Sequence, residues 1–542
     1  MAETVTRAKN ILKTVLGQVP LTAELYWLMR GSDKTLNSRF SLKKLDQHMA
    51  ELVEQASALK MATKPGGKKI FIFSTLHYWI EHATVMGMAL AGLGHEVTLG
   101  YLPYHDWQNP INPFDLRRQN LYAEDILGKA KAVINVVSFL SLHNGYKVVP
   151  EDLRSKIEQV SRYDSMYTLQ VENADTGSAI YKLRLKRNMS AARDAYDYLT
   201  TQKPDVVIVP NGTIQEFGVV YEVARSLGIQ TITYEFGEQR ERMWLAQNGK
   251  VMLQDTGEMW EAFRDLPLKP DEKKTIHEQF EARRGASLWK NFSRQWQQIP
   301  AQGVEAARKQ LGLDKRPVVL LATNVLGDSL TLGREVFSQS MEDWLVKSLQ
   351  YFAGRPDVQL VIRVHPGEVL IHGQSMMDVI QRVLPKLPEF IHVIAPTEKV
   401  NTYDLIAAAD MGLVYTTTVG LEMAMSGIPV VVVGNTHYRG RGFTQDPDTW
   451  VKYHKMLKAI LEKPQDFRLT DEQIESAWAY AYRFFFDYPL PFPWHLVHLW
   501  EDYPKRPIGE LAKSKEWKMY KDTFSYLAGE PLDWQAIRNK HA

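Results

Sequence analysis

Two apolar runs of the sequence end on side chains that can bind an anion. The run QLVIRV ends at His365, which Pro366 follows, and the run MGLVY ends at Thr416, Thr417 and Thr418. Proline biases the residue before it towards an extended backbone, which would point the imidazole of His365 out of the end of a strand. A neutral histidine donates one hydrogen bond to a phosphate oxygen, and hydroxyl and N–H groups at a helix N-terminus bind the same kind of oxygen. The two run ends therefore predict one anionic ligand between them.

A carboxylate follows the threonines by one helical turn. In TTTVGLEMAMSGIPVVVVG, Glu422 lies two residues after Gly420, and a carboxylate there would accept hydrogen bonds from vicinal hydroxyl groups such as those of ribose. Simpler structural roles exist: a turn with a structural histidine, N-capping by one threonine, and a favourable charge at the helix N-terminus for Glu422. Three adjacent hydroxyls exceed what a cap needs, so a phosphate-plus-ribose site is preferred. Glu368 is a further acid with no assigned role.

These residues fall in the second of two series in which apolar, strand-like runs alternate with helical stretches. Such alternation predicts a mostly parallel sheet in each series, with right-handed crossovers. Ligands of open α/β sheets bind beyond the carboxyl ends of the strands, so two facing sheets would form a cleft. The strand-like runs lie at 70–76, 95–102, 131–140, 204–212 and 230–238, then at 316–325, 358–368, 390–396, 411–418 and 428–438, with helices expected at 341–353, 375–386 and 403–409.

The chain is expected to be an α/β protein with two large domains, because 542 residues exceed what one core holds. The expected parts are a helical extension over 1–66, a first Rossmann-like domain over 67–250, an interdomain helical segment over 251–305, a second Rossmann-like domain over 306–475, and a helical crossover and appendage over 476–542.

Composition excludes several classes of protein. The formal net charge of +2 gives no general case for nucleic-acid binding, and the absence of cysteine excludes disulfides and thiolate metal sites. No apolar run reaches about 18 residues, and the N-terminus lacks the apolar core of a signal peptide. We therefore expect a cytoplasmic protein without a transmembrane helix.

Residues 5–16 have a basic amphipathic pattern, with Ile11, Leu12, Val15 and Leu16 among the apolar positions. A helix packed on its own protein is the simpler interpretation. The alternative is contact with a membrane surface that carries a lipid-linked acceptor, which would place the protein at the inner face of the cell membrane. The sequence leaves the oligomeric state open.

The run-end motifs together are more specific than each alone. TTTVGLEMAMSGIPVVVVG resembles the donor-nucleotide motif of GT-B glycosyltransferases. The segments IRVHPGE before it and YRGRGFTQD after it resemble the bacterial capsular polysaccharide synthesis group, which includes the capsule-linker β-Kdo transferases. The chain departs from that group in carrying threonine where serine is usual and Arg441 where an aromatic residue is common.

The resemblance implies a GT-B fold and an inverting, metal-independent sugar transfer with no cofactor besides the nucleotide-sugar substrate. The favoured donor is a CMP-sugar such as CMP-Kdo, with UDP- and GDP-sugars as alternatives. The implied acceptor is a glycan or glycolipid of surface polysaccharide biosynthesis. The implied donor-binding residues are His365, Thr416, Thr417 and Thr418 for phosphate, Glu422 for ribose, Gly420 for close approach, Asn324 after the first strand of the domain, and Arg439 and Arg441 for phosphate or a sugar carboxylate, unless these arginines belong to a solvated loop.

The resemblance also implies that the catalytic base lies in the first domain, near the acceptor hydroxyl. An inverting transfer needs a carboxylate or a histidine there to take the hydroxyl proton. For each candidate, the alternative is a structural role at a helix N-terminus, such as helix capping. The candidates are Glu81 and His82, favoured over His77 in the same loop, then Glu216 after PNG, and Glu238 with Glu235 at the end of a strand, where Arg240 and Arg242 would pair with the two acids.

Two other functions fit the same fold. A hydrolysing UDP-sugar 2-epimerase would need its catalytic acids in the second-domain cleft and no acceptor site. A non-catalytic subunit that binds a sugar or a nucleotide would lack an acid within reach of the anomeric carbon.

Overall fold

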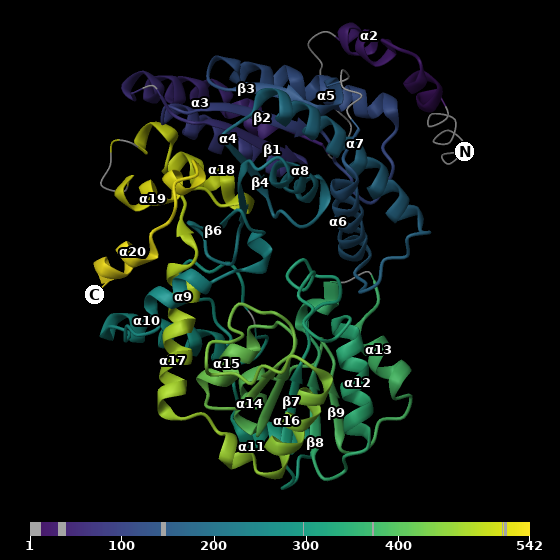
Figure 1. Ribbon diagram of the computed structural model, residues 1–542, viewed down its shortest axis with the longest axis vertical. Helices are drawn as coiled ribbons and strands as arrows, with labels where there is room; N and C mark the ends of the chain where they lie inside the picture. Colours follow the sequence, from purple (N-terminus) through teal and green to yellow (C-terminus); the bar gives the residue numbers. More distant parts are fainter. Residues whose placement is uncertain are drawn as a thin grey trace.

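The computed structural model describes residues 12–30, 40–64, 66–142, 148–295, 297–370, 373–511, 513 and 517–541. Two β-sheets lie one above the other in Figure 1, each covered by helices, with the chain passing between them twice. The carboxyl ends of the strands of both sheets supply loops to the space between the domains.

The first sheet has seven strands in the order β12-β6-β5-β4-β1-β2-β3. Five of them are parallel and follow the doubly wound order, so the expected Rossmann-like domain is confirmed. Strands β6 and β12 add an antiparallel edge that we did not expect. The strands are β1 Lys69–Thr75, β2 Glu96–Leu102, β3 Asn135–Ser138, β4 Val206–Pro210, β5 Gln230–Glu235, β6 Arg242–Gln247 and β12 Leu490–Pro491.

The second sheet repeats the same strand order with five parallel strands. Most of its side chains are buried on both faces, which explains why its strands are continuous apolar runs in the sequence. All five expected strands form. They are β7 Val318–Ala322, β8 Gln359–Arg363, β9 Ile391–Ile394, β10 Met411–Val414 and β11 Val430–Val432.

Helices connect the strands within each domain. The three helices expected in the second domain form within three residues of their expected bounds. The first domain contains α4 His77–Gly92, α5 Pro113–Leu127, α6 Glu151–Leu169, α7 Ala179–Gln202 and α8 Gln215–Ser226, and the second contains α12 Met341–Ala353, α13 Met376–Val383, α14 Thr402–Ala408, α15 Val419–Met425 and α16 Trp450–Glu462.

The segment between the sheets is only partly helical. Helices α9 (Gly257–Phe263) and α10 (Pro270–Arg284) pack into the core of the second domain. The described residues between α10 and α11 (Val304–Leu311) form no helix. After α17 (Asp471–Tyr482) the chain returns to the first sheet, where β12 and Trp494 join the first core. The last helices are α18 Leu499–Asp502, α19 Trp517–Leu527 and α20 Trp534–His541.

Helices α2 and α3 precede the first sheet. Helix α3 (Lys43–Ala62) buries Leu45, Met49 and Leu52 in the first core, and α2 (Thr22–Met29) lies at the edge of the molecule in Figure 1. Residues 5–11 of the amphipathic stretch lie outside the described residues, and 12–18 are helical. No helix in the described part of the chain is long and apolar enough to cross a membrane.

Candidate functional site

A cavity of about 980 Å³ lies between the two sheets. The loop after β5 contributes Glu235 and Glu238 to its walls, and the loop after β7 contributes Gly327 and Asp328. Arg294, from the non-helical part of the interdomain segment, lines it as well. The cavity therefore lies where two facing doubly wound sheets should bind a ligand.

Burial raises the pKa of two carboxyls that line the cavity, Glu235 and Asp328. Oε1 of Glu235 accepts a hydrogen bond from the N–H of Phe236 at 3.0 Å, and its Oε2 accepts one from Nδ2 of Asn211 at 3.3 Å. Burial raises the pKa of Glu235 to about 7, against these two hydrogen bonds. The sequence placed Glu235 at a strand end facing the cleft but favoured other residues as the base.

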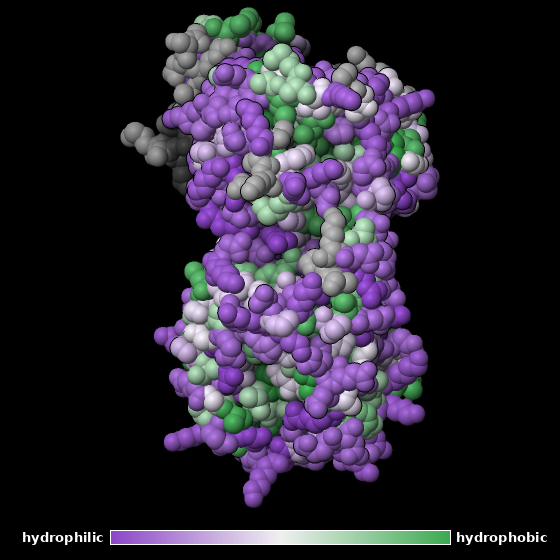
Figure 2. All heavy atoms as spheres, turned by 90° about the vertical axis from the view of Figure 1, so that its left-hand side faces the viewer, coloured by the Kyte–Doolittle hydropathy of each residue, from purple (hydrophilic) through white to green (hydrophobic). Residues whose placement is uncertain are grey.

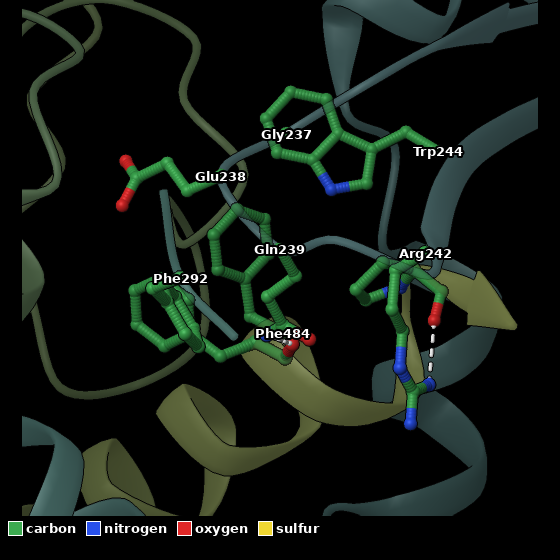
Figure 3. A pocket seen from close by; sticks show the side chains of 9 residues that line it. Gly237, Glu238, Gln239, Arg242, Trp244, Phe292 and Phe484 are labelled. Carbon is green, nitrogen blue, oxygen red and sulfur yellow. Dashed lines mark hydrogen bonds between the residues drawn. The ribbon is translucent and has the colours of Figure 1, made fainter. Parts of the chain in front are cut away.

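Glu238 lines the same cavity and approaches a cation. Its Oε2 lies 3.5 Å from Nη2 of Arg283, a residue of α10. Figure 3 shows the Glu238 carboxylate directed away from Trp244, at the edge of a small pocket that Phe292 and Phe484 also line. Arg283 is therefore the cation near Glu238, where the sequence analysis expected Arg240 or Arg242.

The expected pairing of Arg240 and Arg242 with the two acids is wrong. Arg240 instead pairs with Glu501 at 2.7 Å, and Nη1 of Arg242 donates to the backbone oxygens of Phe486 and Pro489. Both arginines hold the returning C-terminal segment: Arg242 from β6, which pairs with β12, and Arg240 from the loop before β6. The sequence contained no signal for this antiparallel edge.

Glu81 and His82 do not reach the cavity. Oε1 of Glu81 accepts from the N–H of Leu45 at 3.3 Å and Oε2 accepts from Nε1 of Trp500 at 2.9 Å. Glu81 and His77 line a separate pocket of about 640 Å³. Burial raises the pKa of the Glu81 carboxyl.

His82 is a core residue. Its side chain is fully buried, its Nε2 lies 3.2 Å from the backbone oxygen of Trp494, and its ring packs against Tyr234, Phe236 and Phe492. Burial lowers its pKa to about 3, so the ring is neutral at physiological pH. An acceptor hydroxyl cannot approach it without opening the core.

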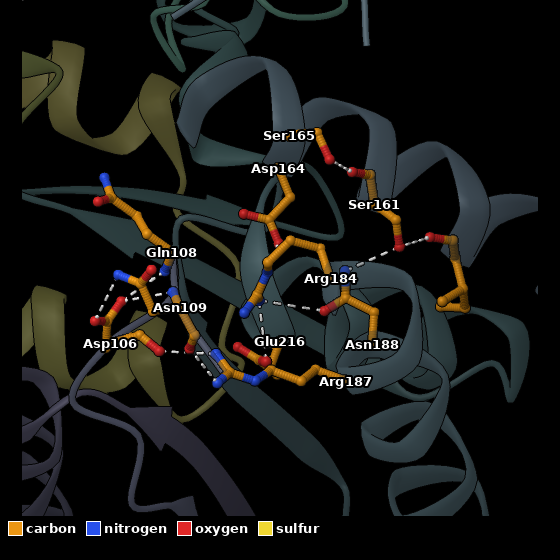
Figure 4. Close-up of polar contacts among 11 residues, drawn as sticks. Asp106, Gln108, Asn109, Ser161, Asp164, Ser165, Arg184, Arg187, Asn188 and Glu216 are labelled. Carbon is orange, nitrogen blue, oxygen red and sulfur yellow. Dashed lines mark hydrogen bonds and ion pairs between the residues drawn. The ribbon is translucent and has the colours of Figure 1, made fainter. Parts of the chain in front are cut away.

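Glu216 belongs to a buried ion-pair network (Figure 4). Arg184 lies between Glu216, at 3.0 Å, and Asp164. All three side chains are at most 2% exposed, and Arg184 also donates to Asn188 at 3.5 Å. The structure therefore places Glu216 in a network that joins α6, α7 and α8, away from the cavity.

His365 follows β8 by two residues and has a defined ring tautomer. Its Nδ1 accepts a hydrogen bond from the N–H of Gly367 at 3.0 Å, and its own N–H donates to Oγ1 of Thr323 at 3.1 Å. Burial lowers its pKa to about 4, with smaller effects from Arg294 and Arg363. The neutral ring therefore carries its proton on Nε2, the nitrogen that can donate to a phosphate oxygen.

The three threonines after β10 have different roles. Oγ1 of Thr417 accepts from the N–H of Val419, the first residue of α15, at 3.4 Å. The N–H of Thr416 donates to Oδ1 of Asn324 at 3.2 Å, which ties the end of β10 to the end of β7. The buried Oγ1 of Thr416 has no hydrogen-bond partner among the described residues. Thr418 is half-buried at the start of α15.

Gly420 has a packing reason to be glycine. A Cβ at this position would lie 2.4 Å from the hydroxyl oxygen of Tyr438 and 2.8 Å from Val414. The Tyr438 hydroxyl donates to the backbone oxygen of Thr417, so the glycine allows Tyr438 to hold the threonine loop. Its close approach to a donor stays a prediction.

Glu422 is held by two residues that the sequence did not suggest. Nη1 of Arg283 and the hydroxyl of Tyr403 both donate to its Oε1 at 2.9 Å. No described hydrogen bond reaches Oε2, and the side chain is 9% exposed. Arg283 and Tyr403 lie in helices α10 and α14, whose residues carry no local signal for binding.

Arg439 and Arg441 are used within the structure. Arg439 donates to the backbone oxygens of Val432 and Pro447, and Arg441 donates to the backbone oxygen of His437 and to Oγ1 of Thr256. They hold the loop after β11 in place, so neither lies in the solvated loop that was their alternative.

Glu368 caps α13 by accepting from the N–H of Met376 at 3.0 Å.

Among the described residues no group of three or more histidines and acids is arranged to hold a metal ion. Arg294 lines the cavity as a cation that could offset the charge of a phosphate.

Comparisons with known proteins give a family match for one region of the chain, which contains the second sheet. Residues 272–469 match the family of capsule polysaccharide biosynthesis proteins. A search of curated proteins found no match. Among solved structures, the chain is similar to a KpsC beta Kdo 2,4 transferase of Thermosulfurimonas dismutans, with 17% identity, a TM-score of 0.33, and coverage of 50% of this chain and 78% of that chain. It is also similar to UDP-GlcNAc 2-epimerase from Neisseria meningitidis bound to UDP-GlcNAc, with 12% identity, a TM-score of 0.25, and coverage of 78% and 99%.

The matched segment contains the whole second sheet with Arg283, His365, the threonines and Glu422. The resemblance expected from the sequence is therefore confirmed for the part of the chain that holds the expected donor site. Residues 272–469 are thus similar to capsule polysaccharide biosynthesis proteins, and the two facing doubly wound sheets have the GT-B architecture.

Proposed function

We propose that the protein is an inverting glycosyltransferase of surface polysaccharide synthesis that takes its sugar from a nucleotide-activated donor. One observation carries the proposal: a cavity of about 980 Å³ between facing sheet ends has Glu235, a carboxyl with its pKa near 7, in its first-domain wall. A general base works best when its pKa lies near the working pH.

The donor nucleotide would lie at the strand ends of the second sheet. Nε2 of His365 carries the ring proton and would donate it to a phosphate oxygen, and the hydroxyls of Thr416 and Thr418 are not used in capping α15. Oε2 of Glu422 would accept from the ribose hydroxyls, while Arg283 and Tyr403 hold Oε1. This supports the roles that the resemblance implied for these residues.

Glu235 would act on the acceptor. The acceptor hydroxyl gives its proton to the Glu235 carboxylate as its oxygen attacks the anomeric carbon. The bond from that carbon to the donor phosphate breaks, and its electron pair leaves with the nucleotide. His365 and the threonine hydroxyls stabilise the charge on the leaving phosphate by hydrogen bonding. One displacement of this kind inverts the anomeric configuration.

The preferred donor is a CMP-activated acidic sugar such as CMP-Kdo, because the HP motif and the resemblance of the run-end motifs to the capsular synthesis group favour it. A thermal-shift screen of CMP, UDP and GDP tests the site, because a ligand that binds only the native state stabilises it by about 2.7 kcal/mol at 100 times its Kd. We expect one nucleotide to raise the melting temperature of the wild type and of His392→Ala, a control in β9, but not of His365→Ala. A shift that persists in His365→Ala, or no shift with any nucleotide, contradicts the donor site.

We also propose that residues 12–29 rest on a membrane surface that carries the acceptor. Their polar groups face inward onto α5, where Lys13 pairs with Asp115 at 2.8 Å and Nε1 of Trp27 donates to Asp125 at 2.9 Å. Ala23 and Trp27 are buried, but most of the apolar side chains face outward, the reverse of a water-facing helix. Figure 2 shows hydrophobic residues at the top edge, where Figure 1 places α2. The exposed side chains are Leu12, Val15, Val19, Leu21, Leu25, Leu28 and Met29.

Sedimentation with phosphatidylglycerol vesicles tests this contact. Burial of one leucine contributes about 1.5–3 kcal/mol, so Leu25→Ser/Leu28→Ser should reduce vesicle binding at least about tenfold. The control Val451→Ser/Met519→Ser changes exposed apolar residues elsewhere. Equal binding by the two double variants and the wild type would contradict the contact.

A further inference from the structure

The separate pocket that contains Glu81 has no role in the donor site. Its volume is about 640 Å³, and it lies between the start of α3, the first turn of α4 and residues 496–501 of the returning segment. None of these parts falls within the matched residues 272–469, so the pocket is built by this chain's terminal extensions and its first domain.

The pocket adjoins the interdomain cavity. Leu496 and Val497 line both, on the stretch that follows the buried Trp494. A chain-like ligand could pass from the cavity into the pocket beside these two residues. The pocket is therefore placed to hold a part of an acceptor that lies away from the reacting hydroxyl.

The floor of the pocket carries groups that bind sugars. Each oxygen of the Glu81 carboxylate accepts one described hydrogen bond and has a second lone pair for a sugar hydroxyl. The ring of Tyr78 is 36% exposed at the pocket wall, and Trp500 is fixed there by its bond to Glu81 and by stacking on His48 at 4.9 Å. Flat aromatic faces pack well against sugar rings.

The mouth of the pocket carries two lysines. Lys43 and Lys44 are exposed and form no ion pair among the described residues. The one other acid of the lining, Glu501, is already paired with Arg240 at 2.7 Å and with His498 at 3.3 Å. The charge of Lys44 also acts on the Glu81 carboxyl, where it opposes the effect of burial on the pKa. Neither lysine is held in an ion pair among the described residues, so both can attract an anionic group of a ligand.

We propose that this pocket binds a negatively charged sugar unit of the acceptor, with its ring against Tyr78, its hydroxyls on Glu81 and its anionic group beside Lys43 and Lys44. The proposal rests on the proposed function for the identity of the ligand as an acceptor. It changes the role of Glu81 from catalytic base to acceptor recognition.

Saturation-transfer NMR with three probes tests the pocket in the full chain. The probes are Kdo as a sugar carboxylate, glucose 6-phosphate as a sugar phosphate, and glucose as the neutral control. We expect at least one acidic sugar to bind more tightly than glucose in the presence of excess CMP. The variant Lys43→Glu/Lys44→Glu should weaken that binding by about tenfold or more, as loss of charge-assisted contacts implies. Tyr78→Ala should weaken it too.

The matched control is Lys182→Glu/Lys186→Glu, which makes the same charge change at exposed positions of α7 that line neither cavity. Equal binding of glucose, an equal effect of the two charge-reversal variants, or displacement of the acidic sugar by CMP would overturn the proposal. Nucleotide thermal shifts measured on the same proteins distinguish a failure of the pocket proposal from a failure of the proposed donor site. A nucleotide shift without sugar binding refutes only the pocket, and sugar binding without any nucleotide shift refutes only the proposed donor site.

Discussion

Arg283 and Glu422 form an ion pair in which Nη1 lies 2.9 Å from Oε1. The other terminal nitrogen of the same guanidinium lies 3.5 Å from Glu238, in the loop after β5. One arginine of the interdomain segment thus contacts an acid of each domain. Arg283 thus connects Glu422, the residue expected to bind ribose, with Glu238, one of the expected catalytic acids.

The Arg283–Glu422 pair should matter for stability. Removing one partner of a buried ion pair costs about 3–5 kcal/mol, because the other charge stays buried and unpaired. We therefore expect Arg283→Met to lower the free energy of unfolding in urea by about this amount. The neighbouring Arg284→Met removes only an exposed contact to Glu281, worth at most about 1 kcal/mol. Equal losses in the two variants would show that the pair is not stabilising.

Glu422→Gln should weaken nucleotide binding. A hydrogen bond to a charged group contributes about 1.5–3 kcal/mol, so its loss should raise the Kd by about 10- to 100-fold in calorimetry with the nucleotide selected by thermal shift. Tyr403→Phe removes only a group that orients Glu422, and its effect should be smaller. A Kd unchanged by Glu422→Gln would mean that ribose binds elsewhere.

Glu235→Gln should remove the catalytic base and lower turnover without changing the affinity for the donor nucleotide. Loss of a general base lowers turnover by about 10²–10⁴-fold, whereas the Kd of the nucleotide should not change. The base acts when deprotonated, so with its pKa at about 7 the wild-type kcat/KM should rise tenfold per pH unit below 7 and level off above it.

Glu238→Gln is the matched variant on the same loop. If it removes the pH dependence while Glu235→Gln retains it, Glu238 is the base.

Glu216→Gln should act on folding and not on catalysis. It leaves Arg184 with Asp164 alone in a fully buried site, so we expect a loss of about 3–5 kcal/mol in unfolding free energy. The turnover of the folded fraction should stay at the wild-type value. The exposed Glu158→Gln is the control. If the Glu216→Gln protein kept its stability but lost turnover, Glu216 would have a role in catalysis.

The sequence indicated the strands and the donor end of the cleft well, for a physical reason. Parallel strands buried on both faces must be apolar throughout, so their ends are marked where polar residues such as His365 and Thr416 begin. Strands β6 and β12 were missed because charged residues or prolines surround them, and their pairing depends on segments more than two hundred residues apart.

The base was harder to predict because several acids and histidines follow strand ends. His82 lies in α4, where Trp79–Gly92 are buried on all sides; the run MGMALAGL indicated such a helix, since a helix that is apolar all round belongs in a core. Arg283 and Tyr403 could not be found at all. They contact Glu422 through helix packing across 139 and 19 residues of chain, respectively, which no local pattern records.

The most direct test of the account is an experimental structure of the protein with the nucleotide selected by thermal shift. The account predicts that a phosphate oxygen lies about 3 Å from Nε2 of His365 and a ribose hydroxyl about 3 Å from Oε2 of Glu422, with Glu235 facing the open side of the phosphate. A nucleotide bound in the Glu81 pocket, or bound in the cleft without contact to His365 and Glu422, would contradict it.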